Sequence, residues 1–447
     1  MNSDKIRHRL IKNPNLTLAV QDGDQIVNVN AEHAFIDPAH NIADQYSSLG
    51  ATNGVLQNSS IRLEFQIFSS RLNEYKFSFL EIPITNNDLV NDLELIPPIF
   101  WCNLIEILIS NNSAQEIYSE GLWMAMRQMT DEQRLIMSRL SNMMYPDTMA
   151  NRDVNLANPI LVPAGTTRYV YLPLFNTLWE QTKVPFNSIK SSTIRYRFTF
   201  DVFSRVTATT NAMVTASNLV AGSVNLYILG SGLSSIGSTI VQSALLEGAH
   251  SYNYYKQERQ ILTNGNTIPG ARINQSLTNL NGTYANIISF LRQLNPVGEQ
   301  QFQFDYTAGT NPTFYAIENP TLKDSNGSPY SLTAESFLWA KWFPGCIDSA
   351  NNSLAQYSTF PDYYSFVEYE LCGDMWNSER RGHAGGIVVN NAWSLEYDVN
   401  SANTTDYLTP YPAITPFVAQ NTETVTISSR LYALDLALGG RASFRAQ

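Results

Sequence analysis

Five histidines, three cysteines and two glycine-rich segments are the residues of this sequence whose types could support catalysis. His383 lies within Gly-His-Ala-Gly-Gly at 382–386, where backbone amides beside a base could form an oxyanion hole. No G-x-S-x-G nucleophile motif accompanies it. The segment SGLSSIGS at 231–238 contains glycines but lacks the lysine of a phosphate-binding loop. We therefore predict that the chain has no catalytic residues and is not an enzyme.

The residue types that commonly bind metals are too scattered to form a local site. The histidines stand at positions 8, 33, 40, 250 and 383. His33 and His40 have acidic neighbours, so a metal site there is an alternative to a plain polar arm. Cys102, Cys346 and Cys372 show no paired spacing, which argues against a disulfide framework and a zinc motif. We predict no bound metal and no cofactor.

Charge is distributed unevenly along the chain. The 447 residues carry a net charge of −11, so the surface as a whole is a poor match for a nucleic-acid backbone. Residues 1–13 nevertheless contain four cations and one anion, and the last nine residues contain two unopposed arginines. The two ends are expected either to touch an anionic partner, genome or lipid head groups, or to be solvated. The candidate contact residues are Lys5, Arg7, Arg9, Lys12, Arg441 and Arg445.

The most apolar window is LIPPIFWCNLIEILIS at 95–110. It is too short for a membrane span, which needs about 20 apolar residues. Pro97 and Pro98 exclude a helix interior, and the isoleucine-rich end predicts a buried strand. The start of the chain lacks the apolar core of a signal peptide. We therefore expect synthesis and assembly in a reducing compartment inside a cell rather than secretion.

Alternating apolar and polar residues predict many short strands, because successive side chains of a strand point to opposite faces. In TIRYRFTFDVF (193–203) the residues Ile194, Tyr196, Phe198, Phe200 and Val202 share one face. The same alternation occurs in SIRLEFQI (60–67), EYKFSF (74–79, with Tyr75, Phe77 and Phe79 on one face), QFQFDY (301–306) and WSLEYDV (393–399). Many short strands between turn residues predict an all-β fold built of sandwiches.

One segment, at about 120–144, has helical periodicity instead. Thr130 and Gln133 have the spacing of a capping box. Apolar side chains then follow at positions 135, 136, 140, 143 and 144. We interpret this methionine-rich face as core or interface packing.

The second half of the chain repeats the pattern of the first. Four pairs of segments occur at offsets of roughly two hundred residues: NLIEILIS with TFYAIEN, EYKFSFLEI with TYANIISFLRQL, TIRYRFTFDV with DYYSFVEYEL, and SVNLYILGSG with SSRLYALDLALGG. In both halves a Tyr-Ser also precedes a helix-like segment that contains Leu-Trp. The repeat predicts a duplicated domain. We expect an N-terminal arm over 1–50, a first domain over 51–240, and a second domain with a C-terminal tail over 241–447.

This order of segments resembles the double jelly-roll major capsid proteins of the tectivirus–adenovirus lineage, which includes virophages and polinton-like viruses. The resemblance is carried by SSIRLEFQIFSSRLNEYKFSFLEIPITN followed by DLELIPPIFWCNLIEILISNNSAQEIYSEGLWMAM, and it extends over about 50–447. It implies two tandem eight-stranded jelly rolls with a short helical insertion in each. One departure is that the second helix-like segment, ESFLWAKWFPGC, stops at Pro344.

The resemblance also implies a function. A major capsid protein of this type forms pseudo-hexameric homotrimers, and these tile an icosahedral virion shell. Expected partners are the chain itself, penton or vertex proteins and minor cement proteins. Both termini of such a protein face inward, so the basic ends would contact an inner membrane or the genome.

Aromatic residues near the expected loop–helix junctions are candidates for core or interface positions: Trp101, Trp123, Trp339 and Trp342. Two alternatives stay open from the sequence. A carbohydrate-binding or carbohydrate-cleaving β-sandwich protein would need aromatic platforms and adjacent acids on one sheet face. A minor vertex or spike protein would usually have one jelly roll rather than two.

Overall fold

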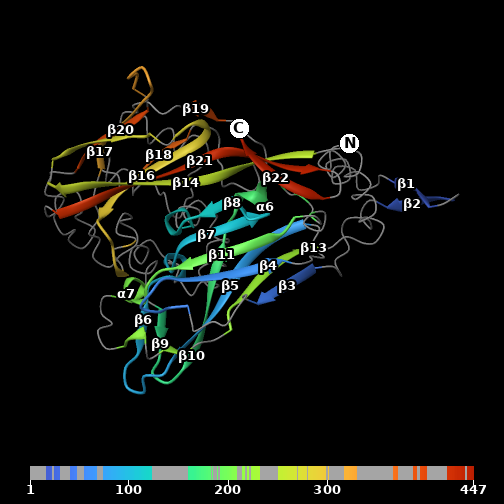
Figure 1. Cartoon of the computed structure of the whole chain (residues 1–447), viewed down its shortest axis with the longest axis horizontal. Coiled ribbons are helices and arrows are strands. Elements are labelled where there is room, and N and C mark those ends of the chain that lie inside the picture. The colour runs from blue at the N-terminus through green and yellow to red at the C-terminus, as the bar shows by residue number, and fades with distance from the viewer. Residues whose placement is uncertain are drawn as a thin grey trace, which may run out of the picture.

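The structure is a computed structural model of the whole chain. The residues that it describes are 17–22, 25–30, 41–47, 55–67, 74–122, 160–182, 184, 189, 192–208, 214–216, 219–220, 223–231, 250–268, 270–278, 280–298, 301, 317–329, 366–370, 386–389, 393–399, 420–437 and 440–447. The strands from residues 41–231 form one group and those from residues 250–446 form a second group beside it (Figure 1).

The first group contains two packed sheets. One sheet has the order β10-β5-β13-β3, with the short β12 also paired to β5. Its strands are β10 (Thr167–Leu174), β5 (Glu74–Asn86), β13 (Asn225–Ser231), β3 (Asn41–Ser47) and β12 (Leu219–Val220). The other sheet has the order β4-β11-β7-β8. Its strands are β4 (Ile61–Ile67), β11 (Ile194–Phe200), β7 (Cys102–Ile109) and β8 (Asn112–Ile117).

This strand order is that of a jelly roll. In chain order the eight main strands are β3, β4, β5, β7, β8, β10, β11 and β13, and they are shared equally between the two sheets. Every pairing is antiparallel. Strands close in sequence, such as β4 and β5, therefore lie in opposite sheets, which is the Greek-key connectivity of the fold.

The second group repeats this arrangement. One sheet has the order β14-β21-β16-β18, with β19 also paired to β16 and β22 to β21. Its strands are β14 (His250–Thr267), β21 (Gln420–Ala437), β16 (Gly282–Gln293), β18 (Phe366–Glu370), β19 (Ile387–Val389) and β22 (Arg441–Ala446). The facing sheet has the order β15-β20-β17, from β15 (Arg272–Ser276), β20 (Ser394–Val399) and β17 (Ile317–Lys323). The prediction of two tandem jelly rolls is thus confirmed.

Three of the four predicted segment pairs occupy equivalent places in the sheets. They are β5 with β16, β13 with β21, and β7 with β17. The fourth pair is wrong. The strand β11 lies between β4 and β7, whereas β18 lies beside β16, where the first group has β10 beside β5. The equivalent of β11 is β20, because both lie in the middle of the three strands that the smaller sheets share.

The alternation in sequence predicts burial well where the ladder is regular. Ile194, Tyr196, Phe198 and Phe200 of β11 are all buried, as are Leu63, Phe65 and Ile67 of β4. Val202 lies beyond the end of β11 and is only partly buried.

The predicted face of β5 is wrong because the strand contains a bulge. The ladder with β13 shifts between the pairs Leu229–Phe77 and Gly230–Tyr75, which leaves Lys76 as an extra residue. Tyr75 therefore turns into the core, where Ser78 and Leu80 also lie. Phe77 and Phe79 lie on the opposite face and are half-buried.

The remaining elements are short. β1 (Thr17–Asp22) pairs with β2 (Gln25–Asn30), and both lie within the segment expected to be an arm, as does the edge strand β3. β6 (Leu93–Leu95) pairs with β9 (Ile160–Val162). Three further helices are η2 (Pro98–Phe100), α6 (Thr177–Thr182) and α7 (Phe203–Val206). Of the helix predicted at 120–144, the described residues up to Leu122 are helical, with Leu122 N donating to Tyr118 O.

Two other predicted elements, the strand QFQFDY beyond Gln301 and the helix-like segment ESFLWAKWFPGC (335–346), lie outside the described residues. Within the part of the chain that the structure describes, no helix is both long and apolar enough to cross a membrane.

The hydrophobic core joins the two groups of strands. The larger cluster contains first-group residues such as Phe65, Trp101 and Trp179 together with second-group residues such as Phe290 and Leu434. A second cluster, including Leu291 and Leu395, fills the space between the two sheets of the second group. The two jelly rolls thus share one continuous apolar interior instead of touching only at their surfaces.

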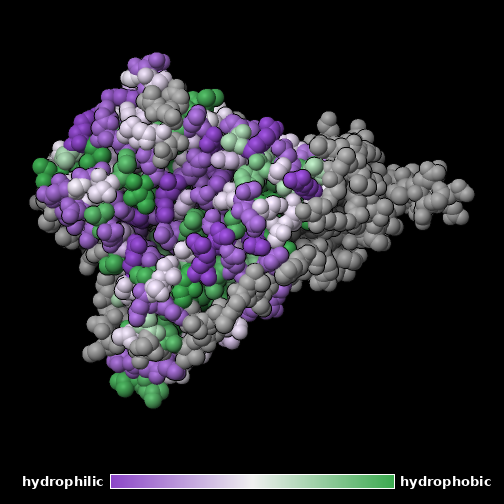
Figure 2. Space-filling model, viewed as in Figure 1, coloured by the Kyte–Doolittle hydropathy of each residue, from purple (hydrophilic) through white to green (hydrophobic). Residues whose placement is uncertain are grey.

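Much of the face seen in Figure 2 is hydrophilic, and apolar residues gather at its lower tip. The most exposed large apolar side chains of the described residues are Leu89 and Val90, in the loop between β5 and β6. Asp88 shapes this loop by accepting hydrogen bonds from Val90 N and Asn91 N, both at 2.9 Å.

Candidate functional site

The site with the most buried charge lies where the first jelly roll meets the second. Just after β8 the chain enters a helical turn that contains Glu120. This side chain is only 2% exposed. The ladder of the second roll brings Arg292 of β16 and Glu423 of β21 opposite each other as a cross-strand pair. Arg259 of β14 completes a four-residue charge cluster.

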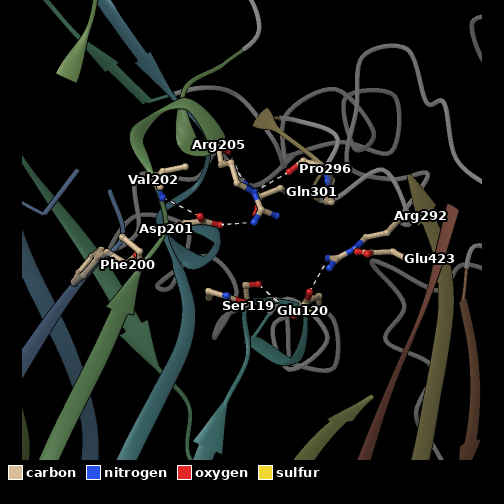
Figure 3. Close-up of polar contacts among 12 residues, drawn as sticks. Ser119, Glu120, Phe200, Asp201, Val202, Arg205, Arg292, Pro296, Gln301 and Glu423 are labelled. Carbon is tan, nitrogen blue, oxygen red and sulfur yellow. Dashed lines mark hydrogen bonds and ion pairs between the residues drawn. The ribbon is translucent and has the colours of Figure 1, made fainter. Parts of the chain in front are cut away.

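The charge cluster is joined by short contacts (Figure 3). Arg292 donates from Nη1 to Glu120 Oε1 at 2.6 Å and from Nε to Glu423 Oε1 at 2.7 Å. Arg259 Nη1 lies 3.3 Å from Glu120 Oε2. Arg292 and Glu423 are 7% and 8% exposed, so the pairs are shielded from water. Two guanidinium groups balance two carboxylates, which is the condition under which buried charges are tolerated.

The electrostatics of the charge cluster favour the ionised forms. Burial alone would raise the pKa of Glu120, but the charges of Arg259 and Arg292 outweigh it and lower that pKa to about 2. Burial likewise opposes the charge of Arg292, while Glu120 and Glu423 raise its pKa. Removing Glu120 or Arg292, which each hold two partners, would leave buried charges without full compensation. The charge cluster therefore fixes the first roll against the second in one position.

A second polar contact joins α7 to the segment after β16. Arg205 Nη1 lies 3.2 Å from Asp201 Oδ2, and Arg205 Nε donates to Pro296 O at 3.1 Å. Gln301 Nε2 donates to the carbonyl oxygen of Arg205 at 2.6 Å (Figure 3). Asp201 also accepts a hydrogen bond from Val202 N at 2.8 Å, which holds its carboxylate at the end of β11.

The free edge of β14 is covered by the first roll. Tyr255 N donates to Gln181 Oε1 of α6 at 2.9 Å, and Thr177 of α6 donates to Tyr255 O. On the neighbouring residues, Tyr254 OH donates to Ala114 O at 2.7 Å and Lys256 Nζ lies 2.8 Å from Glu116 Oε1. Side chains of α6 thus satisfy the two backbone groups of Tyr255, where this edge would otherwise be open to another strand.

The outer faces of the two smaller sheets carry related networks of opposite charge. Arg197 on β11 contacts Glu64 on β4 at 2.7 Å and Glu106 on β7 at 3.3 Å. In the second roll the equivalent middle strand β20 carries Glu396 instead. Its flanking strands provide Arg272 at 2.9 Å and Lys323 at 2.7 Å. Hydrogen bonds from Lys323 and Arg272 lower the pKa of Glu396. The two rolls are therefore equivalent in construction but different in surface charge.

These arrangements are ion pairs and hydrogen bonds that hold the strands and the two rolls together. Within the described residues no group of three or more His, Cys, Asp or Glu side chains lies close enough to hold a metal ion. His250, at the start of β14, is the one histidine in the described ranges; His33, His40 and His383 lie outside them.

The structure describes some of the predicted site residues, namely Trp101, Arg441 and Arg445. Trp101 is buried in the core, where its Nε1 donates to Ile96 O at 2.8 Å. Arg441 and Arg445 are exposed on β22, and Arg445 Nε lies 3.0 Å from Asp435 Oδ2. The others lie outside the described residues and their roles stay predictions: Lys5, Arg7, Arg9, Lys12, Trp123, Trp339 and Trp342.

Sequence reasoning missed the charge cluster entirely. Glu120 and Arg292 are 172 positions apart, and Arg292 and Glu423 are 131 apart. No local spacing links such residues. The available signal was the pair of segments SFLE (78–81) and SFLR (289–292) inside the predicted repeat, where a basic residue replaces an acidic one on an apolar strand.

Two jelly rolls in tandem, with one shared core, define the chain as a double jelly roll. Comparison with solved structures gives the same fold. The quasi-atomic model of the PBCV-1 virus capsid matches with a TM-score of 0.61 and 11% identity over 91% of this chain and 97% of that chain. The cryo-EM structure of the Sputnik virophage matches with a TM-score of 0.56 and 13% identity over 96% of this chain and 93% of that chain.

The Faustovirus major capsid protein also matches, with a TM-score of 0.53 and 10% identity over 98% of this chain and 99% of that chain. At these identities the likeness concerns the fold. A scan against protein-family models and a search of curated proteins find no match.

Proposed function

We propose that this chain is a major capsid protein of a virus. The observation that carries the proposal is the double jelly roll itself, whose described strands run from residue 41 to residue 446. Three solved structures of the same fold are of a virus capsid, a virophage and a major capsid protein. The role is structural rather than enzymatic, and the location is the virion.

The unit of assembly in this proposal is a homotrimer. Three copies place six jelly rolls around one axis, which gives a pseudo-hexameric outline that can tile an icosahedral shell. Such a trimer closes through heterologous contacts, in which two different surfaces of the chain meet. The shared core and the buried charge cluster support this proposal, because a rigid pair of rolls keeps its two outer surfaces at a fixed angle.

The basic ends are proposed to face inward. Arg441 and Arg445 are exposed on β22, so both are available for an anionic partner such as lipid head groups or the genome. Penton or vertex proteins and minor cement proteins are the other expected partners. Assembly inside the host cell completes the proposal.

A carbohydrate-binding sandwich is the second candidate, and one observation favours it. Phe79, Tyr171 and Tyr227 lie together with Glu81 on the outer face of the sheet β10-β5-β13-β3. Aromatic rings beside an acid are the features that such a protein needs. The vertex or spike alternative is less well supported, because the chain has two jelly rolls.

Electron microscopy of the chain expressed alone tests the proposal. Particles with a hexagonal outline built from three copies, or closed shells, are expected. Isolated two-roll particles at high protein concentration, together with specific binding on a glycan array, would instead favour the carbohydrate-binding candidate.

Deletion of residues 1–13 tests the role of the basic N-terminal end. We expect trimers to form as in the full chain, while the yield of closed particles falls, because the four cations of this segment no longer contact the interior partner. Native gel mobility and particle counts by microscopy measure the two steps separately. Normal particles from the deletion variant would mean that this end is only a solvated tail.

A further inference from the structure

The helical turn that contains Glu120 lies directly against β14 of the second roll. The guanidinium group of Arg259 lies over the ring of Tyr118, 4.4 Å from its centre, and also pairs with Glu120 at 3.3 Å. Gly121 follows Glu120 in the same turn and is buried. Gln257 stands two residues before Arg259 on β14 and is only 4% exposed. The turn and the strand are therefore held side by side by Arg259.

The position of Gly121 leaves no room for a larger residue. A Cβ atom added there would lie 2.3 Å from Oε1 of Gln257 and 2.9 Å from its Cδ and Nε2 atoms. Non-bonded heavy atoms pack best at about 3.5 Å or more, so an alanine would force either the turn or the carboxamide to retreat. The carboxamide has little space in which to move, because Gln257 is almost fully buried.

The backbone conformation gives no reason for a glycine in this turn. Gly121 does not have the positive φ angle that Gly165 and Gly265 have. Glycine is also a poor helix former, because it loses more conformational entropy than alanine when the backbone is fixed. The close approach of the Gln257 side chain is therefore the physical reason for glycine at this position.

The carboxamide of Gln257 is itself unusual. Its Oε1 atom is buried and has no hydrogen-bond partner in the described part of the chain. Most buried acceptors in native proteins are paired, since an unpaired one lowers stability. The carboxamide therefore needs another reason to lie where it does, and its contact with the backbone of Gly121 provides one.

The separation between the turn and β14 decides whether Glu120 reaches its partners. Its Oε1 lies 2.6 Å from Arg292 on β16 (Figure 3), and its Oε2 lies 3.3 Å from Arg259 on β14. Hydrogen bonds between charged groups are strong because they are short. A retreat of the turn by several tenths of an ångström would lengthen both contacts and weaken the charge cluster.

We propose that Gly121 and Gln257 are positioning residues of the charge cluster. The close contact between the glycine backbone and the buried carboxamide sets the distance from β14 at which Glu120 reaches both arginines. Neither residue carries a charge, so their role is to place the charges that other residues carry. The inference concerns the junction inside one copy of the chain, and it holds whether or not copies assemble into a trimer.

The variant Gly121→Ala tests the contact through the sign of its effect. Urea unfolding at neutral pH gives the equilibrium constant for unfolding. We expect this constant to rise at least about tenfold, because the added methyl group overpacks a filled site. Without the contact, the constant should instead fall about two- to fivefold, because alanine is the better helix former.

Removing the carboxamide should rescue the alanine. In the Gln257→Ala background, Gly121→Ala should change the unfolding constant by less than about threefold, since the atoms that the methyl group would meet are gone. Gln260→Ala is the matched control on the same strand. Its Nε2 donates to Ser276 O of the second roll at 3.3 Å, and its removal should not rescue Gly121→Ala. If Gly121→Ala alone does not fold, a folded double variant with Gln257→Ala gives the same answer.

Acid unfolding separates positioning from simple packing. Arg259 and Arg292 hold the pKa of Glu120 at about 2, below its ordinary value of 4.5. The stabilisation is therefore present above about pH 4.5 and is lost as the pH falls toward 2. If Gly121→Ala moves Glu120 away from the arginines, stability should fall less steeply between about pH 5 and 2 than in the parent chain. The double variant with Gln257→Ala should restore the parent slope, whereas a packing defect alone would leave the slope unchanged.

Three results would each overturn the proposal. Gly121→Ala that is at least as stable as the parent chain would mean that the site has room for a side chain. A penalty that persists in the Gln257→Ala background, including a double variant that does not fold, would mean that another neighbour limits the space. An acid slope of Gly121→Ala identical to that of the parent chain would mean that other contacts position Glu120. None of these results bears on the capsid proposal, which the mass of the chain in solution tests.

Discussion

Glu120 is the single residue on which the junction depends most. It accepts hydrogen bonds from two arginines and is almost fully buried, so its charge is compensated only by these partners. A buried ion pair adds little net stability compared with apolar packing, but breaking it is costly. The residue therefore specifies how the two rolls meet more than it strengthens the fold.

Replacing Glu120 with glutamine should lower the free energy of unfolding by about 3–5 kcal/mol, because Arg259 and Arg292 then lack their shared carboxylate. Urea unfolding monitored by tryptophan fluorescence measures the change. Asp435→Asn is the matched control: its partner Arg445 is 62% exposed, and loss of such a surface pair costs at most about 1 kcal/mol. Equal effects of the two substitutions would contradict the assigned importance of the charge cluster.

Acid should weaken the fold through the same residue. The pKa of Glu120 in the folded chain is about 2, below its ordinary value of 4.5. The stabilisation is present above about pH 4.5 and is lost as the pH falls toward 2, and it amounts to about 3 kcal/mol. Unfolding free energies measured between about pH 5 and 2 should show this slope in the parent chain. The slope should be shallower in Glu120→Gln, and identical slopes would mean that other carboxylates control acid stability.

At the scale of elements, the helix α6 provides hydrogen-bond partners for backbone groups on the edge of β14, as a neighbouring strand would. Thr177 and Gln181 bond both backbone groups of Tyr255 on the outer edge of β14. At this residue the edge of β14 therefore has no free backbone group for an added strand. The first roll thus blocks strand addition at one point of this edge of the second roll.

Gln181→Leu removes the acceptor of Tyr255 N while keeping a side chain of similar size. We expect a loss of about 1–3 kcal/mol, because a buried amide loses its hydrogen bond. Hydrogen exchange should show faster exchange of the Tyr255 amide, while amides of β4 and β11 stay protected. Unchanged exchange at Tyr255 would show that α6 is not what protects this edge.

The sequence predicted elements better than it predicted their contacts. β4, β11 and β20 follow from local alternation, because one buried face imposes a period of two. β7 follows from its apolar, isoleucine-rich run after Pro97 and Pro98. The face of β5 was wrong because a single bulge at Lys76 shifts the pattern, and the ladder that creates it involves a strand about 150 residues away. The pairing of β11 with β18 was wrong because strands with one buried face look alike in composition.

The charge cluster could not be predicted from the sequence, for a related reason. Its four residues come from β14, β16, β21 and the turn after β8, and each alone looks like an ordinary surface charge on a strand or helix. Only the three-dimensional pairing of the rolls brings them together. The basic ends and three of the four tryptophans chosen from the sequence stay predictions.

At the scale of the whole molecule, the two rolls are one folding unit. Phe290, Val425 and Leu434 of the second roll pack in the same apolar cluster as the core of the first. Separating the halves would expose these side chains, and each buried one contributes about 1.5–3 kcal/mol. The proposed boundary between residues 240 and 241 therefore separates two jelly rolls along the chain. It does not separate two domains that are stable on their own.

Neither 1–240 nor 241–447 should therefore fold cooperatively when expressed alone. We expect aggregation or binding of a hydrophobic dye, and recovery of a native fold when the two fragments are refolded together. Circular dichroism and denaturant titration measure both. A sharp, independent unfolding transition for either fragment would contradict the shared core.

The mass of the purified chain in solution tests the central claim most directly. Size-exclusion chromatography with multi-angle light scattering should give a species of three times 50.1 kDa, the mass of a homotrimer. That result is the one that the proposed homotrimer predicts. A well-folded monomer of 50.1 kDa at every concentration would contradict it.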